Sequence, residues 1–238
     1  VLASFMGLYA QEIDGNKLLR HLEYLSSDAL EGRKPLSKGS SMAQKYILTE
    51  LTSFNLVEPL YPDFIQKFSF EDRRSKKMVV DASNMVVFIP GTSSKKVIVV
   101  TAHYDHVGIG RADAAGDSIY NGANDDAAGT TAVMMLAKYY AKKRDNARTL
   151  IFAAFTAEES GGHGSQYFSK QFNPDQVMAM FNLEMIGTES KWGKNSAYIT
   201  GYEKSSMGEI LKQNLVGSQF TFYPDPYVDQ NLFYRSDN

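Results

Sequence analysis

Residues 96–101 read KVIVVT, a nearly continuous apolar run that is typical of a strand buried on both faces of a sheet. A helical pattern follows at 127–143, and a second apolar strand at 149–155. A short helix at 164–170 and a third strand at 177–185 complete the series. Because strands alternate with helices, this order predicts an α/β fold with a parallel sheet and helices on its faces.

The residues before this series add four more elements. Apolar residues recur at helical spacing in 16–24 and 41–51, and the pattern becomes β-like in 64–70 and 78–89. A chain of 238 residues is long enough for one sizeable core, and no repeat or linker divides it. We expect a single domain over 12–238.

The first eleven residues, VLASFMGLYAQ, are apolar and end abruptly at the polar Glu12. This pattern resembles the end of a signal peptide beside its cleavage zone, which predicts an exported protein, periplasmic or extracellular. An N-terminal strand or helix packed on the domain is the alternative. No other segment approaches the roughly 20 apolar residues of a membrane span, so we expect none.

The composition limits which binding partners and which kinds of functional site the chain can have. The formal net charge of -2, with 22% charged residues, provides no field of one sign to bind nucleic acid or an anionic membrane surface. The chain has no Cys, which excludes disulfides, thiolate metal sites and cysteine nucleophiles. Any metal must therefore be held by Asp, Glu and the four His residues.

Acidic or histidine residues lie at or just after the end of each of the three predicted strands. His103 and Asp105 follow the first strand, Glu158 and Glu159 follow the second, and Glu184 ends the third. Functional groups in parallel sheets collect beyond the carboxyl ends of the strands, so these side chains are expected to share one cleft.

A fourth acidic group lies in the turn into the long helix, where 121–129 reads NGANDDAAG. Carboxylates gathered in one cleft repel one another unless a cation neutralises them, which indicates a metal site. His nitrogen and carboxylate oxygen favour zinc, while manganese or cobalt would be chemically tolerated. Each motif alone is weak, since Asp-Asp before a helix often serves only as a cap. Their order along the chain makes the metal site the favoured interpretation.

Together the motifs AHYDHVG, NGANDDAAG, AEESGGHGS and NLEMIG resemble those of peptidase family M28, the two-zinc aminopeptidase type. The resemblance extends over about 22–238, including the leading segment HLEYLSSDALEGR. It implies the three-layer α/β/α zinc-exopeptidase (phosphorylase/hydrolase-like) fold, with a mostly parallel mixed sheet flanked by helices. It also implies two zinc ions in a complete domain and peptides as substrates.

Residue by residue, the resemblance assigns His103 and Glu184 to one metal, Glu159 to the other, and Asp125 as the bridge between them. Many members have Asp where Glu184 stands. Glu158 would be the general base, taking a proton from a water that bridges the metals. The resemblance implies that Asp105 orients His103 and that the peptide bond after Asp125 is cis.

One part of the family's pattern does not occur in these 238 residues. The family's last ligand is a His that binds the second metal beyond a stretch resembling YRSDN at 234–238. We therefore expect the domain to lack its C-terminal part and the second metal site to be incomplete. The other histidines receive no ligand role: His21 and His106 are interpreted as structural, and His163 as a residue of the pocket rim.

The function implied by the resemblance is metal-dependent release of N-terminal residues from peptides. A glutaminyl cyclase-like enzyme of the same fold is an alternative, but it would use one metal and would not keep the residue matching His103. A non-catalytic binding ectodomain is the second alternative, which the retained Glu158 disfavours. Aminopeptidase is preferred over carboxypeptidase by analogy alone.

Overall fold

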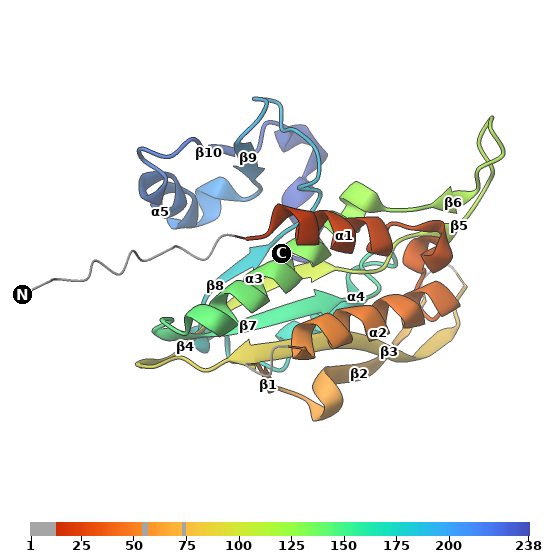
Figure 1. Ribbon diagram of the computed structural model, residues 1–238, viewed down its shortest axis with the longest axis horizontal. Coiled ribbons are helices and arrows are strands. Elements are labelled where there is room, and N and C mark those ends of the chain that lie inside the picture. Colours follow the sequence, from red (N-terminus) through yellow and green to blue (C-terminus); the bar gives the residue numbers. More distant parts are fainter. Residues whose placement is uncertain (1–12, 54–56, 73–74) are drawn as a thin grey trace, which may run out of the picture.

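The computed structural model describes residues 13–53, 57–72 and 75–238, and a six-stranded mixed sheet lies at its centre (Figure 1). Neighbouring strands follow the order β1-β3-β7-β4-β8, and β2 also pairs with β3. β4 is parallel to β7 and β8, whereas β3 is antiparallel to β1, β2 and β7. The expected mixed sheet is confirmed. Its strands are β1 Glu58–Pro59, β2 Ile65–Glu71, β3 Met78–Ile89, β4 Ser94–His103, β7 Arg148–Phe155 and β8 Val177–Asn182.

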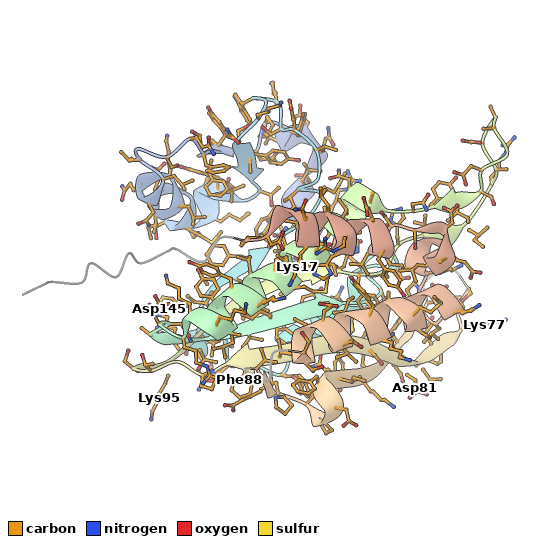
Figure 2. All side chains as sticks on the ribbon, in the orientation of Figure 1. Lys17, Lys77, Asp81, Phe88, Lys95 and Asp145 are labelled. Carbon is orange, nitrogen blue, oxygen red and sulfur yellow. The ribbon has the colours of Figure 1, made fainter. Side chains whose placement is uncertain are left out.

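Helices cover both faces of this sheet, which confirms the three layers. α1, α2 and α3 lie on one face and α4 packs on the other (Figure 1). Side chains alternate between the faces: Val87 and Ile89 belong to the core under α1 to α3, and Val86 to the core under α4. Figure 2 shows the side chains of the described residues on the same ribbon. The helices are α1 Gly15–Leu25, α2 Lys38–Thr52, α3 Ala128–Lys143 and α4 His163–Ser169.

The three parallel strands end at the same edge of the sheet. His103 at the end of β4 pairs with Phe155 at the end of β7, and Thr101 pairs with Asn182 at the end of β8. β8 is three residues shorter than predicted because the backbone leaves the extended conformation after it, with Met185 at φ 53°. Glu184 consequently lies in the segment after the strand.

A glycine allows the start of α3 to approach the end of β8 closely. A Cβ on Gly129 would lie 1.9 Å from the carbonyl oxygen of Leu183 and 2.5 Å from the carboxylate of Asp126. Any larger residue at Gly129 would therefore push the helix away from the strand end. This contact brings the NGANDDAAG turn to the edge where the parallel strands finish.

Smaller elements lie outside the central sheet. β5 Gly108–Ile109 pairs with β6 Ile119–Tyr120, and the parallel pair β9 Ser196–Ile199 and β10 Thr221–Pro224 adjoins α5 Met207–Asn214 (Figure 1). Every helix in the described part of the chain is too short or too polar to cross a membrane. Residues 1–11, interpreted as part of a signal peptide, lie outside the described residues, so export stays a prediction.

Candidate metal centre

Two groups of potential metal ligands meet at the edge where β4, β7 and β8 end. In the first, His103, Asp125 and Glu184 each offer one ligand atom within 4.8 Å of the other two. In the second, His106, Asp125 and Glu159 do the same. Asp125 belongs to both groups, as a bridging carboxylate would. The four residues predicted as metal ligands therefore come together, and His106 joins them.

Four of these ligand atoms lie in close pairs that are not hydrogen bonds. His103 Nε2 is 3.0 Å from Asp125 Oδ1, and His106 Nδ1 is 2.6 Å from Glu159 Oε1. All four atoms are buried, and none has a hydrogen-bonding partner among the described residues. Buried polar atoms are normally satisfied, so a set of unsatisfied donors and acceptors that converge indicates a bound cation. Imidazole nitrogen and carboxylate oxygen are donors that suit zinc.

The backbone around Asp105 orients the imidazole of His103. The His103 side chain is fully buried, and its Nδ1 lies 3.1 Å from the backbone carbonyl oxygen of Asp105 and 3.7 Å from the Asp105 carboxylate. With Nδ1 facing these acceptors, Nε2 points to Asp125 with its lone pair available. The resemblance assigned this orienting role to the carboxylate of Asp105, and the structure places the closer acceptor on its main chain.

Asp126 joins three segments of the centre, a role that the sequence analysis missed. Its buried carboxylate accepts backbone N–H groups of His103 at 3.3 Å, Gly129 at 3.1 Å and Met185 at 3.2 Å. These residues belong to the end of β4, the start of α3 and the segment after β8. The peptide bond between Asp125 and Asp126 is cis, as expected. The second Asp of the pair thus positions the segments that carry ligands.

Glu158 lies at the turn after β7 with its backbone held on both sides. Its N–H donates to the Asp105 carboxylate at 3.2 Å, and its carbonyl oxygen accepts from Gly161 and Gly162. No hydrogen bond holds the Glu158 carboxylate among the residues that the structure describes. Burial raises the pKa of Glu158 to about 8, and the negative charges of Asp237 and Glu184 add to the increase.

Glu184 has neighbours that the sequence analysis did not identify. Its carboxylate accepts from Asn182 Nδ2 at 3.2 Å and from the hydroxyl of Ser236. Burial raises its pKa to about 7, and the charges of Asp125 and Asp237 contribute. Two half-buried carboxylates with raised pKa values at one site indicate that a nearby positive charge is needed to keep both ionised.

Residues 84–238 match the model of the peptidase family M28, which is more than half of the chain. The chain belongs to this family. A protein of Leptosphaeria maculans named "Probable zinc metalloprotease" is 35% identical over 114 residues, which cover 47% of this chain and 26% of that relative. The chain thus spans about a quarter of that relative's length. The residues matched by the M28 family model, 84–238, include every predicted site residue.

Solved structures with the same fold include a leucine aminopeptidase precursor and a glutaminyl cyclase. A leucine aminopeptidase precursor from Bacteroides thetaiotaomicron aligns with a TM-score of 0.68 at 18% identity, covering 91% of this chain and 78% of that one. A glutaminyl cyclase from the same organism aligns with a TM-score of 0.66 at 18% identity, covering 95% and 83%. At this identity the likeness shows the fold alone, and the two neighbours have different activities.

Proposed function

We propose that this chain is a zinc-dependent aminopeptidase, which hydrolyses the first peptide bond of its substrates. The observation that carries the proposal is the position of Glu158 beside the ligand groups. Its neighbour Glu159 has a carboxylate oxygen 2.6 Å from His106, whereas no hydrogen bond holds the Glu158 carboxylate among the described residues. Glu159 thus contacts another candidate ligand, whereas the carboxylate of Glu158 is available to carry a proton.

The residues present fit two zinc ions. His103, Asp125 and Glu184 would hold one, and Asp125 and Glu159 would take part in holding the other. When bound, the ions would supply a Lewis acid for the scissile carbonyl and make a water more acidic. The printed name of the Leptosphaeria relative supports the choice of zinc, as does the donor set of imidazole and carboxylate.

Glu158 would act as the general base and then as the general acid. It would take a proton from the attacking water and give that proton to the amine that leaves. Its pKa of about 8 belongs to the protein without metal, and a cation nearby favours the ionised form. The group would therefore exchange protons near neutral pH, where such catalysis is most effective. The bond from its N–H to Asp105 holds it in place for both steps.

Hydrolysis is preferred over cyclisation because the first ligand group keeps its histidine, His103. His103 is fully buried and directed at Asp125, as a metal ligand would be. The resemblance to cyclases implies a single metal without the residue matching His103. The cyclase neighbour makes this the alternative to test directly.

The proposal is tested by assaying the zinc-loaded chain on aminoacyl chromogenic substrates and on peptides that begin with glutamine. We expect release of N-terminal residues that stops with chelator and returns with zinc. Glu158→Gln should lower kcat by about 10² to 10⁴-fold while leaving bound metal unchanged, because it removes only the proton carrier.

The control for this variant is Glu189→Gln, which removes the charge of an exposed glutamate and should leave kcat unchanged. Hydrolysis that survives chelator or Glu158→Gln would contradict the mechanism. Conversion of N-terminal glutamine to a cyclic product, without release of any residue, would show that the cyclase is the correct alternative.

A further inference from the structure

Asn182 is a side chain at the candidate metal centre that has no part in the proposed mechanism. It is the last residue of β8, just before the segment that carries Glu184. Its amide nitrogen donates to Glu184 Oε2 at 3.2 Å and to the hydroxyl oxygen of Ser236 at 2.7 Å. Its amide oxygen accepts from the hydroxyl of Thr101 at 2.9 Å. Both polar atoms of this amide therefore have partners.

The hydroxyl of Thr101 fixes the direction in which the amide of Asn182 faces. Thr101 is fully buried on β4 and pairs with Asn182 across the two strands. If the amide were rotated by half a turn, its oxygen would face the carboxylate of Glu184. Two oxygen acceptors repel each other, whereas an N–H group beside a carboxylate forms a charge-assisted hydrogen bond. The observed orientation is therefore the one that presents N–H groups to Glu184.

The same pair of residues joins the two segments that lead to His103 and Glu184. These two residues belong to one group of potential ligands, His103 at the end of β4 and Glu184 after β8. The backbone N–H of Leu183 donates to the carbonyl oxygen of Thr101 at 2.8 Å. A main-chain bond and a side-chain bond thus connect the two segments directly before their candidate ligands.

The two carboxylate oxygens of Glu184 have different surroundings. Each oxygen of a carboxylate offers about two lone-pair sites. Oε2 accepts from Asn182 and from the hydroxyl of Ser236, which occupy both of its sites. Oε1 accepts no hydrogen bond from the described residues. Because a metal ligand needs a free lone pair, Oε1 is the oxygen that remains available to an ion.

We propose that Asn182 is a positioning residue for the metal ion that His103 and Glu184 would hold. Its amide keeps Oε2 directed away from the ion, so that Glu184 binds through Oε1 alone. Glu has one more rotatable bond than the Asp that many family members have here, so it needs more support to keep one orientation. The inference rests on the proposed metal-dependent function, but it concerns the geometry of a ligand and is measured without substrate.

The first measurement is zinc affinity from equilibrium dialysis, for the ion whose binding His103→Ala abolishes. Asn182→Leu keeps the shape of the side chain and removes its hydrogen bonds. We expect the affinity to fall by about 10- to 100-fold, the usual effect of losing a group that supports a ligand. Thr101→Val should also lower it, and Thr101→Ser, which keeps a hydroxyl, should bind nearly as the wild type does. Asn214→Leu, at an exposed position of α5, is the matched control and should change nothing.

The second measurement separates the geometry of the ligand from a general loss of stability. In chains loaded with Co²⁺, the visible absorption weakens as the coordination number of the ion increases. Without Asn182, both oxygens of Glu184 are free to bind, so Asn182→Leu should weaken the band that is absent from His103→Ala. Urea denaturation of the metal-free chains verifies that each variant is folded. The two Thr101 variants give the same test if Asn182→Leu does not fold.

Zinc affinity at the wild-type level in Asn182→Leu would overturn the inference. A lower affinity with an unchanged Co²⁺ band would overturn it too, because Asn182 would then only stabilise the end of β8. Equally weak binding by Thr101→Val and Thr101→Ser would contradict the part assigned to the hydroxyl. If the variants behave as expected but no peptide is hydrolysed, the proposed function fails and this inference holds. Hydrolysis together with unchanged zinc affinity in Asn182→Leu is the reverse result.

Discussion

Arg33 shows how much a single buried side chain contributes to this centre. It is 1% exposed and donates to four backbone carbonyl oxygens, those of Leu25, Tyr104, Asn121 and Gly122. Tyr104 lies beside His103, and Asn121 and Gly122 lie in the turn that leads to Asp125, so three of these carbonyls belong to segments that carry candidate metal ligands. The guanidinium therefore ties the N-terminal helical segment to the centre.

Arg33 also brings a positive charge to an acidic site. Burial lowers its pKa to about 10, and Asp105 and Asp126 oppose that decrease. The group remains charged at neutral pH, where it offsets part of the repulsion among the carboxylates. The segment ending in Arg33 was included in the family resemblance, but no local pattern indicated that this side chain would be buried.

Replacing Arg33 with Met should lower the free energy of unfolding by at least about 3 kcal/mol. The change removes the guanidinium from four carbonyl oxygens, of which only that of Gly122 keeps another donor, the N–H of Ala127. Each unsatisfied buried group costs about 1 to 3 kcal/mol. Urea denaturation of the metal-free chain measures the effect. Lys34→Met, at the exposed next position, should change stability by less than about 0.5 kcal/mol. Equal losses in the two variants would contradict the role given to Arg33.

Secondary structure elements were predicted well wherever periodicity was strong. β3 has the predicted bounds, and α3, β4 and β7 differ from the predicted ranges by one or two residues at their ends. β8 was predicted too long, because the alternating pattern does not reveal the turn of the backbone at Met185. The interface between α1 and α2 could not be predicted, since it depends on how two separate helices pack.

His21 is the polar contact at that helix interface. It is 7% exposed, and its Nδ1 lies 2.7 Å from the hydroxyl oxygen of Tyr46 on α2. Burial lowers its pKa below 6.5 because the imidazolium loses its hydration, and Glu50 opposes the decrease. Its interpretation as structural agrees with this position. The positively charged groups that lower the pKa further are Lys17, Arg20 and Lys138.

The lowered pKa of His21 predicts that stability falls as pH decreases. Between the folded pKa and 6.5, the unfolded chain binds more protons at this site than the folded chain, so stability rises with pH in that window. His21→Asn keeps a side-chain amide near Nδ1 but does not titrate. Between pH 7.5 and 5.5 the wild type should lose more stability than His21→Asn, as measured by urea denaturation at each pH. Identical losses in the two chains would contradict the prediction.

The candidate metal centre combines segments from across the molecule. Its candidate ligands come from the end of β4, the segment after β8, the turn before α3 and the turn after β7. Because the carboxylates repel one another without a cation, metal binding and the stability of this edge of the sheet are coupled. The unfolded chain does not preserve this arrangement of ligands.

Zinc should therefore raise the midpoint of thermal unfolding. A ligand that binds only the folded state adds about 4 kcal/mol when its free concentration is 1,000 times its Kd. Differential scanning calorimetry with zinc, and again after chelator, measures the shift. His103→Ala should show a smaller zinc-dependent shift than the wild type, because it removes a buried ligand. A midpoint that does not respond to chelator would contradict the presence of a metal centre.

The amino-acid sequence by itself determined the alternation of strands and helices and the acidic or histidine residues at the strand ends. Both are local properties, visible in hydrophobic periodicity and in motif spacing. The four predicted ligands and Glu158 could be proposed this way because each lies within a short motif beside a predicted strand or helix.

Only the tertiary structure decided which distant groups meet. Asp105 lies 53 residues from Glu158, and Arg33 lies 71 residues from Tyr104, yet each pair forms a hydrogen bond. The approach of His106 to Glu159 likewise joins two loops from different strands. These contacts depend on β4 lying beside β7 and on close packing around Gly122 and Gly129. Strand order and packing depend on the whole chain, so no local pattern could reveal them.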